Sequence, residues 1–172
     1  MFDVAIESEE TLGFFKQRAE KTLANDRESI DQAILPIVDL LQTFPGIAPA
    51  WSCESHPEKE HPTDIYVTCV INETGADHIQ AIYKAWLSIL DKQHRSYPQP
   101  IKGSPGEYKS QPNPYYVNPW QVFIRINRLT WPRDFSRKYM VVKIGYHWTT
   151  LVKKEHALKT FTDAIKIVKE SI

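Results

Sequence analysis

Apolar residues recur at helical spacing in two stretches near the start of the chain. The first, residues 8–24, carries a narrow apolar stripe behind Ser8, whose hydroxyl makes it a good N-cap residue. The second, residues 28–44, has a broader apolar face but contains Pro36. Because proline lacks a backbone N–H, we expect this second helix to be kinked or divided at Pro36.

Two further helices are predicted later in the chain. Residues 74–91 give the strongest helical pattern, with Thr74 and Asp77 arranged like a capping box. A final helix is expected from Thr150 to about residue 170. The predicted core residues of these two helices are Ile79, Ile82, Tyr83, Trp86 and Leu90, and then Leu158, Phe161, Ile165 and Val168.

Alternating patterns predict four strands. Residues 65–72 are apolar on both faces, which is typical of a central strand. Residues 47–52 are interrupted by Pro49, which favours a position at a sheet edge because proline cannot donate to the ladder. Residues 120–129 and 139–148 are separated by a short connection and read as an antiparallel hairpin, which we expect to join the sheet of residues 65–72.

The predicted order is ααββαββα, which indicates a single α+β domain over residues 1–172 with a mostly antiparallel sheet packed by helices. Residues 94–119 contain six prolines and four tyrosines and no regular pattern. Long loops of this kind in compact domains are often lids or binding loops. We expect this one to lie across the sheet and cover the ligand site.

The composition and the start of the sequence bear on the cellular compartment of the protein. The zero formal net charge and 42% hydrophobic content are ordinary for a soluble globular protein. No apolar run is long enough to span a membrane, and the acidic start MFDVAIESEE does not resemble a signal peptide. Two cysteines suit a reducing compartment. These features predict a cytoplasmic protein without a membrane partner.

The net charge of zero conceals a difference between the two halves. Residues 1–94 carry a balance of −9 and residues 95–172 a balance of +9. The basic half predicts either a positive surface that meets phosphate or another acidic partner, or simple attraction between the halves across the fold. The first alternative requires a positive surface from Arg125, Arg128, Arg133 and Arg137.

The segment around Cys53 holds the densest group of reactive side chains, namely Trp51, Ser52, Cys53, Glu54 and His56. One hypothesis makes Cys53 a nucleophile activated by a histidine, with His56, His94 or His147 as partner. A second places zinc on Cys53, His56 and His61, with Cys69 as a fourth ligand. The irregular spacing and the strand position of Cys69, typical of a small core residue, lead us to assign no metal ligand.

The third hypothesis is ligand binding at a tight turn from Ser52 to His56. Backbone N–H groups of such a turn bind phosphate or carboxylate, and Arg125 and His147 of the predicted hairpin are assigned to the same site. Further charge is available from Arg128, Arg133, Arg137 and Lys138, and Trp51, Trp131, Trp148 and the loop tyrosines offer rings for stacking on a base. We expect a small anionic ligand or a nucleotide, with RNA as an alternative partner. No Walker A or G-x-G-x-x-G sequence is present.

A resemblance rests on the layout from Phe14 to His56. It runs through Lys16, Leu23, Ile30-Asp31, an apolar helix and Pro45-Gly46-Ile47 to Ser52-Cys53-Glu54-Ser55-His56. This layout resembles the start of the wybutosine-synthesis methyltransferase family, which carries an SCSGR-like turn, and the ending also resembles the SCEGH turn of small bacterial and phage proteins. The first likeness implies an enzyme that modifies tRNA with S-adenosylmethionine. The second leaves open a phage-type module that inhibits another protein.

Overall fold

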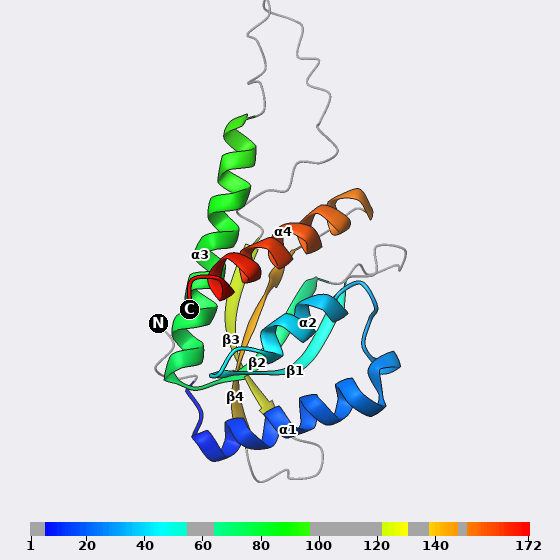
Figure 1. The fold of residues 1–172 in the computed structure, drawn as a ribbon, viewed down its shortest axis with the longest axis vertical. Coiled ribbons are helices and arrows are strands. Elements are labelled where there is room, and N and C mark those ends of the chain that lie inside the picture. The colour runs from blue at the N-terminus through cyan, green and yellow to red at the C-terminus, as the bar shows by residue number, and fades with distance from the viewer. Residues whose placement is uncertain (1–5, 55–63, 97–121, 131–137, 148–150) are drawn as a thin grey trace, which may run out of the picture.

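The computed structural model describes residues 6–54, 64–96, 122–130, 138–147 and 151–172. It shows a single α+β domain in which a four-stranded antiparallel sheet is packed by helices in the order ααββαββα, as the sequence predicts (Figure 1). Within the described residues, no helix is long and apolar enough to cross a membrane. The loop expected at residues 94–119 lies outside the described residues, except that residues 94–96 continue the third helix.

The first helix, α1 (Glu9–Asn25), begins where the sequence predicts. The Ser8 hydroxyl oxygen accepts a hydrogen bond from the Thr11 backbone N–H at 3.2 Å, and Glu9 and Glu10 lie in the first turn. This arrangement satisfies one of the N–H groups that a helix start leaves without an internal partner and places negative charge at the positive end of the helix dipole.

The second predicted helix is wrong in its extent. A short 3₁₀ turn, η1 (Arg27–Ser29), comes first, and α2 (Leu35–Gln42) begins only afterwards, with Pro36 in its first turn. Proline is tolerated there because the first N–H groups of a helix have no intrahelical acceptor. Pro36 therefore helps to start a helix and does not kink one.

The third helix, α3 (Glu73–Ser96), is longer than predicted and is capped by a different residue. The side-chain oxygen of Asn72 accepts a hydrogen bond from the Gly75 N–H at 2.9 Å, so the predicted cap at Thr74 is wrong. Asparagine is among the best N-cap residues, and it stands directly after the preceding strand. The last helix, α4 (Leu151–Lys169), follows the prediction, although Thr150 lies outside the described residues.

The sheet contains β1 (Ile47–Glu54), β2 (Ile65–Ile71), β3 (Val122–Thr130) and β4 (Lys138–Tyr146) in the order β1-β2-β4-β3. The predictions of a central second strand, an edge position for the first, and an antiparallel hairpin of the last two are all confirmed. A bulge interrupts β1 between Pro49 and Trp51. A proline and a bulge at a sheet edge both hinder pairing with strands of other molecules.

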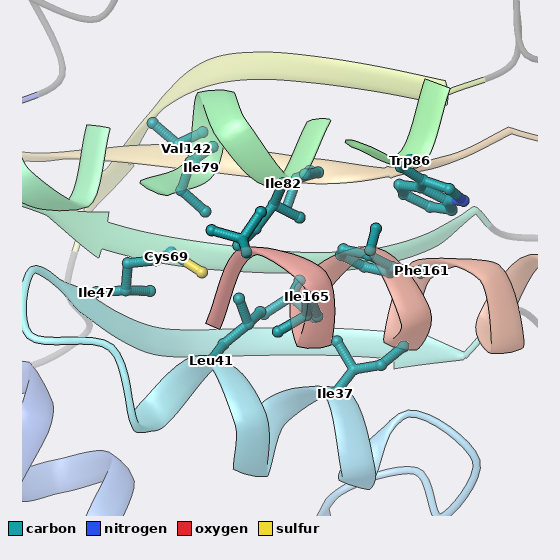
Figure 2. Close-up of a cluster of buried hydrophobic side chains, with 14 of the residues drawn as sticks. Ile37, Leu41, Ile47, Cys69, Ile79, Ile82, Trp86, Val142, Phe161 and Ile165 are labelled. Carbon is teal, nitrogen blue, oxygen red and sulfur yellow. The ribbon is translucent and has the colours of Figure 1, made fainter. Parts of the chain in front are cut away.

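One face of the sheet carries the main core, which it shares with α2, α3 and α4. Figure 2 shows Ile37 and Leu41 of α2 and Phe161 of α4 meeting the strands from one side. The predicted core residues of α3 and α4 belong to this cluster, except that Tyr83 is partly buried and packs against it. The opposite face is covered at one end by α1, which crosses the lower ends of the strands in Figure 1 and packs on a smaller cluster.

Candidate functional site

The predicted site residues Ser52, Cys53 and Glu54 lie in a strand and not in a turn. Strand β1 continues through Ser52 and Cys53 to Glu54, which pairs with Ile65 at the start of β2. The prediction of a tight turn from Ser52 is therefore wrong for these three residues, because ladder pairing with β2 extends their backbone. The side chains of Cys53 and Glu54, and the whole of His56, lie outside the described residues.

The other cysteine is a core residue, as its strand pattern indicates. Cys69 is fully buried among the apolar side chains of the main core, and this burial raises the pKa of its thiol. A protonated thiol in such a place behaves as a small hydrophobic group. Among the described residues, no group of three or more His, Cys, Asp and Glu side chains is placed to hold a metal ion.

The structure brings two of the predicted residues, Arg125 and His147, together on the sheet. They lie on the face that α1 covers only at its other end, together with side chains from three strands. We call this region the polar sheet face, and it consists of Tyr66 of β2, Phe123, Arg125 and Asn127 of β3, Lys143 of β4, and His147 just after β4. Strand pairing accounts for the grouping, since Arg125 pairs with Lys143 across the hairpin.

Gly145 allows the two rings of the polar sheet face to close over β4. It pairs with Tyr66 on one side and with Phe123 on the other. A Cβ at this position would lie 2.8 Å from Tyr66 Cβ, 2.9 Å from Phe123 Cζ and 2.1 Å from the Ile65 carbonyl oxygen. Any larger residue would therefore push the rings apart, so glycine is a requirement of this surface.

Cations lie directly on these rings. Lys143 Nζ is 3.6 Å from the centroid of the Tyr66 ring and 5.9 Å from that of Phe123. The Arg125 guanidinium carbon lies 4.8 Å from the Phe123 centroid. A cation over the face of an aromatic ring is attracted by the ring's quadrupole. The rings thus hold the positive charges at defined positions on the surface.

His147 connects Arg125 to a carboxylate. Its Nδ1 lies 2.9 Å from Asp64 Oδ1 and its Nε2 lies 2.8 Å from Arg125 Nη2, while its ring stacks on Phe123 with centroids 4.2 Å apart. A carboxylate only accepts hydrogen bonds and a guanidinium only donates them. Nδ1 of His147 therefore carries the proton and donates to Asp64, and Nε2 accepts from Arg125. The chain from Asp64 through His147 fixes the orientation of the exposed Arg125 guanidinium.

A pocket of about 450 Å³ adjoins this cluster. Residues from all four strands line this sheet-face pocket, namely Trp51, Tyr66, Thr68, Asn127, Arg128, Val141 and Lys143. Its volume is within the range of small-molecule sites. The lining combines two aromatic rings, two cations, an amide and a hydroxyl, and among the described residues no carboxylate belongs to it. This set suits a ligand that has both a planar ring and a negative charge.

Trp51 also belongs to a smaller pocket on its other side. This pocket, of about 190 Å³, lies between α1, α2 and β1 and includes Ser52. Arg18 of α1 lines it and places its guanidinium carbon 5.3 Å from the centroid of the Trp51 ring. Partial burial lowers the pKa of Arg18. The two predicted residues Trp51 and Ser52 thus share the smaller pocket, and of the two only Trp51 also lines the sheet-face pocket.

Most residues of this site were missed in the sequence. They are Asp64, Tyr66, Phe123, Asn127 and Lys143 on the polar sheet face and beside it, with Thr68 and Val141 in the pocket lining. A signal was available for Phe123, because the alternation in residues 120–129 places it with Arg125 and Asn127 on the less apolar face. Asp64 and Lys143 required the register of β2, β3 and β4, which pairs residues far apart in the chain. Arg133 and Arg137, predicted to join this charge, lie outside the described residues.

Comparison of the chain with models of protein families, with curated protein sequences and with solved structures gives no match. The contacts of the polar sheet face and its pocket are therefore the evidence for a function of this domain.

Proposed function

We propose that this protein binds a nucleotide-like ligand, in which a planar ring is joined to a phosphate, in the sheet-face pocket. The observation that carries the proposal is the shared lining: Lys143 and Arg128 border the same pocket as the rings of Trp51 and Tyr66. Neither the cations nor the rings alone would indicate a nucleotide. Cations without rings suit many anions, and rings without cations suit any apolar molecule.

The cationic half of the pocket accounts for the phosphate. Arg128 is exposed and Lys143 is half-buried, so both charges are within reach of a ligand that enters from solvent. Hydrogen bonds from such cations to phosphate oxygens are shorter and stronger than those between neutral groups. Lys143 is also held over the Tyr66 ring, which limits the conformational freedom it would lose on binding.

The aromatic half accounts for the ring. Trp51 and Tyr66 are both half-buried, so part of each ring borders the pocket. Stacking of a base on an aromatic side chain contributes about 1–3 kcal/mol. Asn127 and Thr68 also line the pocket and supply an amide and a hydroxyl for the polar edge of a base.

This proposal keeps the ligand class predicted from the sequence and changes the location of its site. The predicted centre at Ser52 to His56 is replaced by a pocket that retains Trp51 and adds residues of β2, β3 and β4. Arg125 and His147, also predicted, lie beside the pocket on the polar sheet face.

Isothermal titration calorimetry with each of the common nucleoside monophosphates tests the proposal. Lys143→Gln removes one charge-assisted hydrogen bond to phosphate, which contributes about 1.5–3 kcal/mol, so the affinity should fall by about tenfold or more. Lys166→Gln is the matched control, because it removes the same charge from an exposed position on α4, which packs on the other face of the sheet. Absence of binding at millimolar nucleotide, or equal losses in both variants, would contradict the proposal.

The methyltransferase activity implied by the resemblance stays a prediction. The side chains of Cys53 and Glu54 and the whole of Ser55 and His56, which carry most of the likeness, lie outside the described residues. Titration with S-adenosylmethionine in the same experiment separates the two ideas. Binding of this cofactor that Lys143→Gln leaves unchanged would favour the methyltransferase and place its site away from the sheet-face pocket.

A further inference from the structure

We infer that the nucleotide-like ligand is part of a single-stranded nucleic acid, and that Arg125 holds a second phosphate beside the sheet-face pocket. This inference rests on the proposed function, since it extends the ligand outward from the same pocket. It arises because Arg125 is held by His147 and by the Phe123 ring and yet lies outside the pocket lining.

Arg125 lies next to the pocket along both directions of the sheet. It stands two residues from Asn127 on β3, a distance of about 7 Å, and directly opposite Lys143 on β4, about 5 Å away. A phosphate bound by Lys143 and a second phosphate bound by Arg125 would therefore be close neighbours. Successive phosphates of one strand meet this requirement, whereas a nucleoside monophosphate has only one.

The described residues that contact Arg125 hold it in place without neutralising it. Its two described contacts are the neutral His147 ring, which accepts one N–H, and the face of the Phe123 ring. Neither contact is a carboxylate. The Asp64 carboxylate binds the opposite side of the imidazole, so it orients His147 and leaves the guanidinium charge available. A guanidinium has five N–H donors in a planar fork that matches two oxygens of a phosphate.

The requirement for a single strand follows from the pocket. A base can stack on an aromatic ring of this pocket only if it has left its own base stack, and unpaired strands expose their bases without that cost. Proteins that bind single strands combine aromatic side chains for the bases with a row of cations for the backbone. Lys143 and Arg125, which pair across β3 and β4, provide two neighbouring cations, and Arg128 borders the same pocket.

Fluorescence anisotropy with a labelled strand of ten thymidines tests the inference, and thymidine monophosphate serves as the single-nucleotide probe. The strand should bind more tightly than the monophosphate. Arg125→Gln should weaken binding of the strand about tenfold and leave binding of the monophosphate unchanged. Because each phosphate contact on a single strand contributes about 0.7 to the slope of log affinity against log salt concentration, the variant should lose about that amount.

Two further variants complete the experiment. Arg125→Lys keeps the charge and should retain the wild-type salt slope, while Lys166→Gln should behave as wild type in every measurement. An unchanged salt slope in Arg125→Gln would overturn the inference, and so would binding of a duplex as tightly as the single strand. In either case, binding of the monophosphate would still support the proposed function. Failure of both the strand and the monophosphate to bind would overturn both.

Discussion

Replacement of Thr160 by valine should destabilise the fold through a partner on another helix. Trp86 of α3 and Thr160 of α4 are both fully buried, and the indole N–H donates to the threonine hydroxyl oxygen at 3.0 Å. The hydroxyl in turn donates to carbonyl groups of its own helix, 3.0 Å and 3.1 Å away. Valine has nearly the same shape but no oxygen, so Thr160→Val leaves the Trp86 N–H buried without an acceptor.

The magnitude follows from the unsatisfied donor. A buried polar group that loses its partner costs about 1–3 kcal/mol, and each kcal/mol lowers the Tm of a domain of this size by about 2–4 °C. Packing should contribute little to the change, because valine fills the space of threonine and the Trp86 ring still stacks on Phe161 with centroids 4.1 Å apart. Urea unfolding followed by far-ultraviolet circular dichroism should show a lower midpoint with an unchanged m value.

A control and a double mutant separate this cause from others. Thr162→Val lies on the same helix, but its described hydrogen bond goes only to the Leu158 carbonyl at 2.8 Å, so it should cost clearly less. In a Trp86→Phe background the indole N–H is gone, and Thr160→Val should then have little further effect. Equal costs for the two threonine variants, or an undiminished cost in the Trp86→Phe background, would refute the reasoning.

Three further predictions concern stability and reactivity. Gly75→Ala should destabilise the fold by about 1–3 kcal/mol, because its Cβ would lie 1.8 Å from the Gly46 carbonyl oxygen. Gly13→Ala, whose Cβ would have nothing within 4 Å, should stabilise α1 by about 0.5–1 kcal/mol. Thermal unfolding of both variants checks this contrast. Burial raises the pKa of the Cys69 thiol above the ordinary 9.0, so the folded state holds the thiol proton more tightly than the unfolded state does. The free energy of unfolding should therefore fall as the pH rises above 9.0. Urea titrations at several pH values should show a weaker pH dependence in Cys69→Ala. Ser8→Ala removes the cap of α1 and should cost about 0.5–2 kcal/mol by chemical denaturation, with no loss if the cap is unimportant.

The sequence predicts most of the fold because the patterns that specify it are local. The apolar stripe of α3, the alternation of β2 and the proline of β1 each lie within one element, and each gives the correct result. The errors occur where two local signals compete. Pro36 is able to kink a helix or to begin one, and Asn72 and Thr74 are both acceptable caps, so only the packed structure decides between them.

The candidate site is predicted less completely because it depends on pairing between distant strands. Arg125 and His147 are recognisable as chemistry-bearing residues, but their contact requires the β3–β4 register, and Asp64 joins them only through the pairing of β2 with β4. The many reactive side chains near Cys53 in the sequence predicted a binding turn, but the backbone from Ser52 to Glu54 is a strand. Residues that are close along the chain need not be close in space. Here the residues of the polar sheet face lie on or next to three strands.

The position of α4 has a consequence for how the protein is made. Its side chains fill the centre of the main core, where Phe161 and Ile165 are fully buried between residues contributed by α2 and α3 (Figure 2). While the ribosome is still translating the segment before α4, Trp86 lacks the Phe161 ring on which it stacks in the finished fold. The finished core can form only after residue 168 has left the exit tunnel, so the apolar surface that the residues before α4 contribute to this core stays exposed, and prone to aggregation, until synthesis is almost complete.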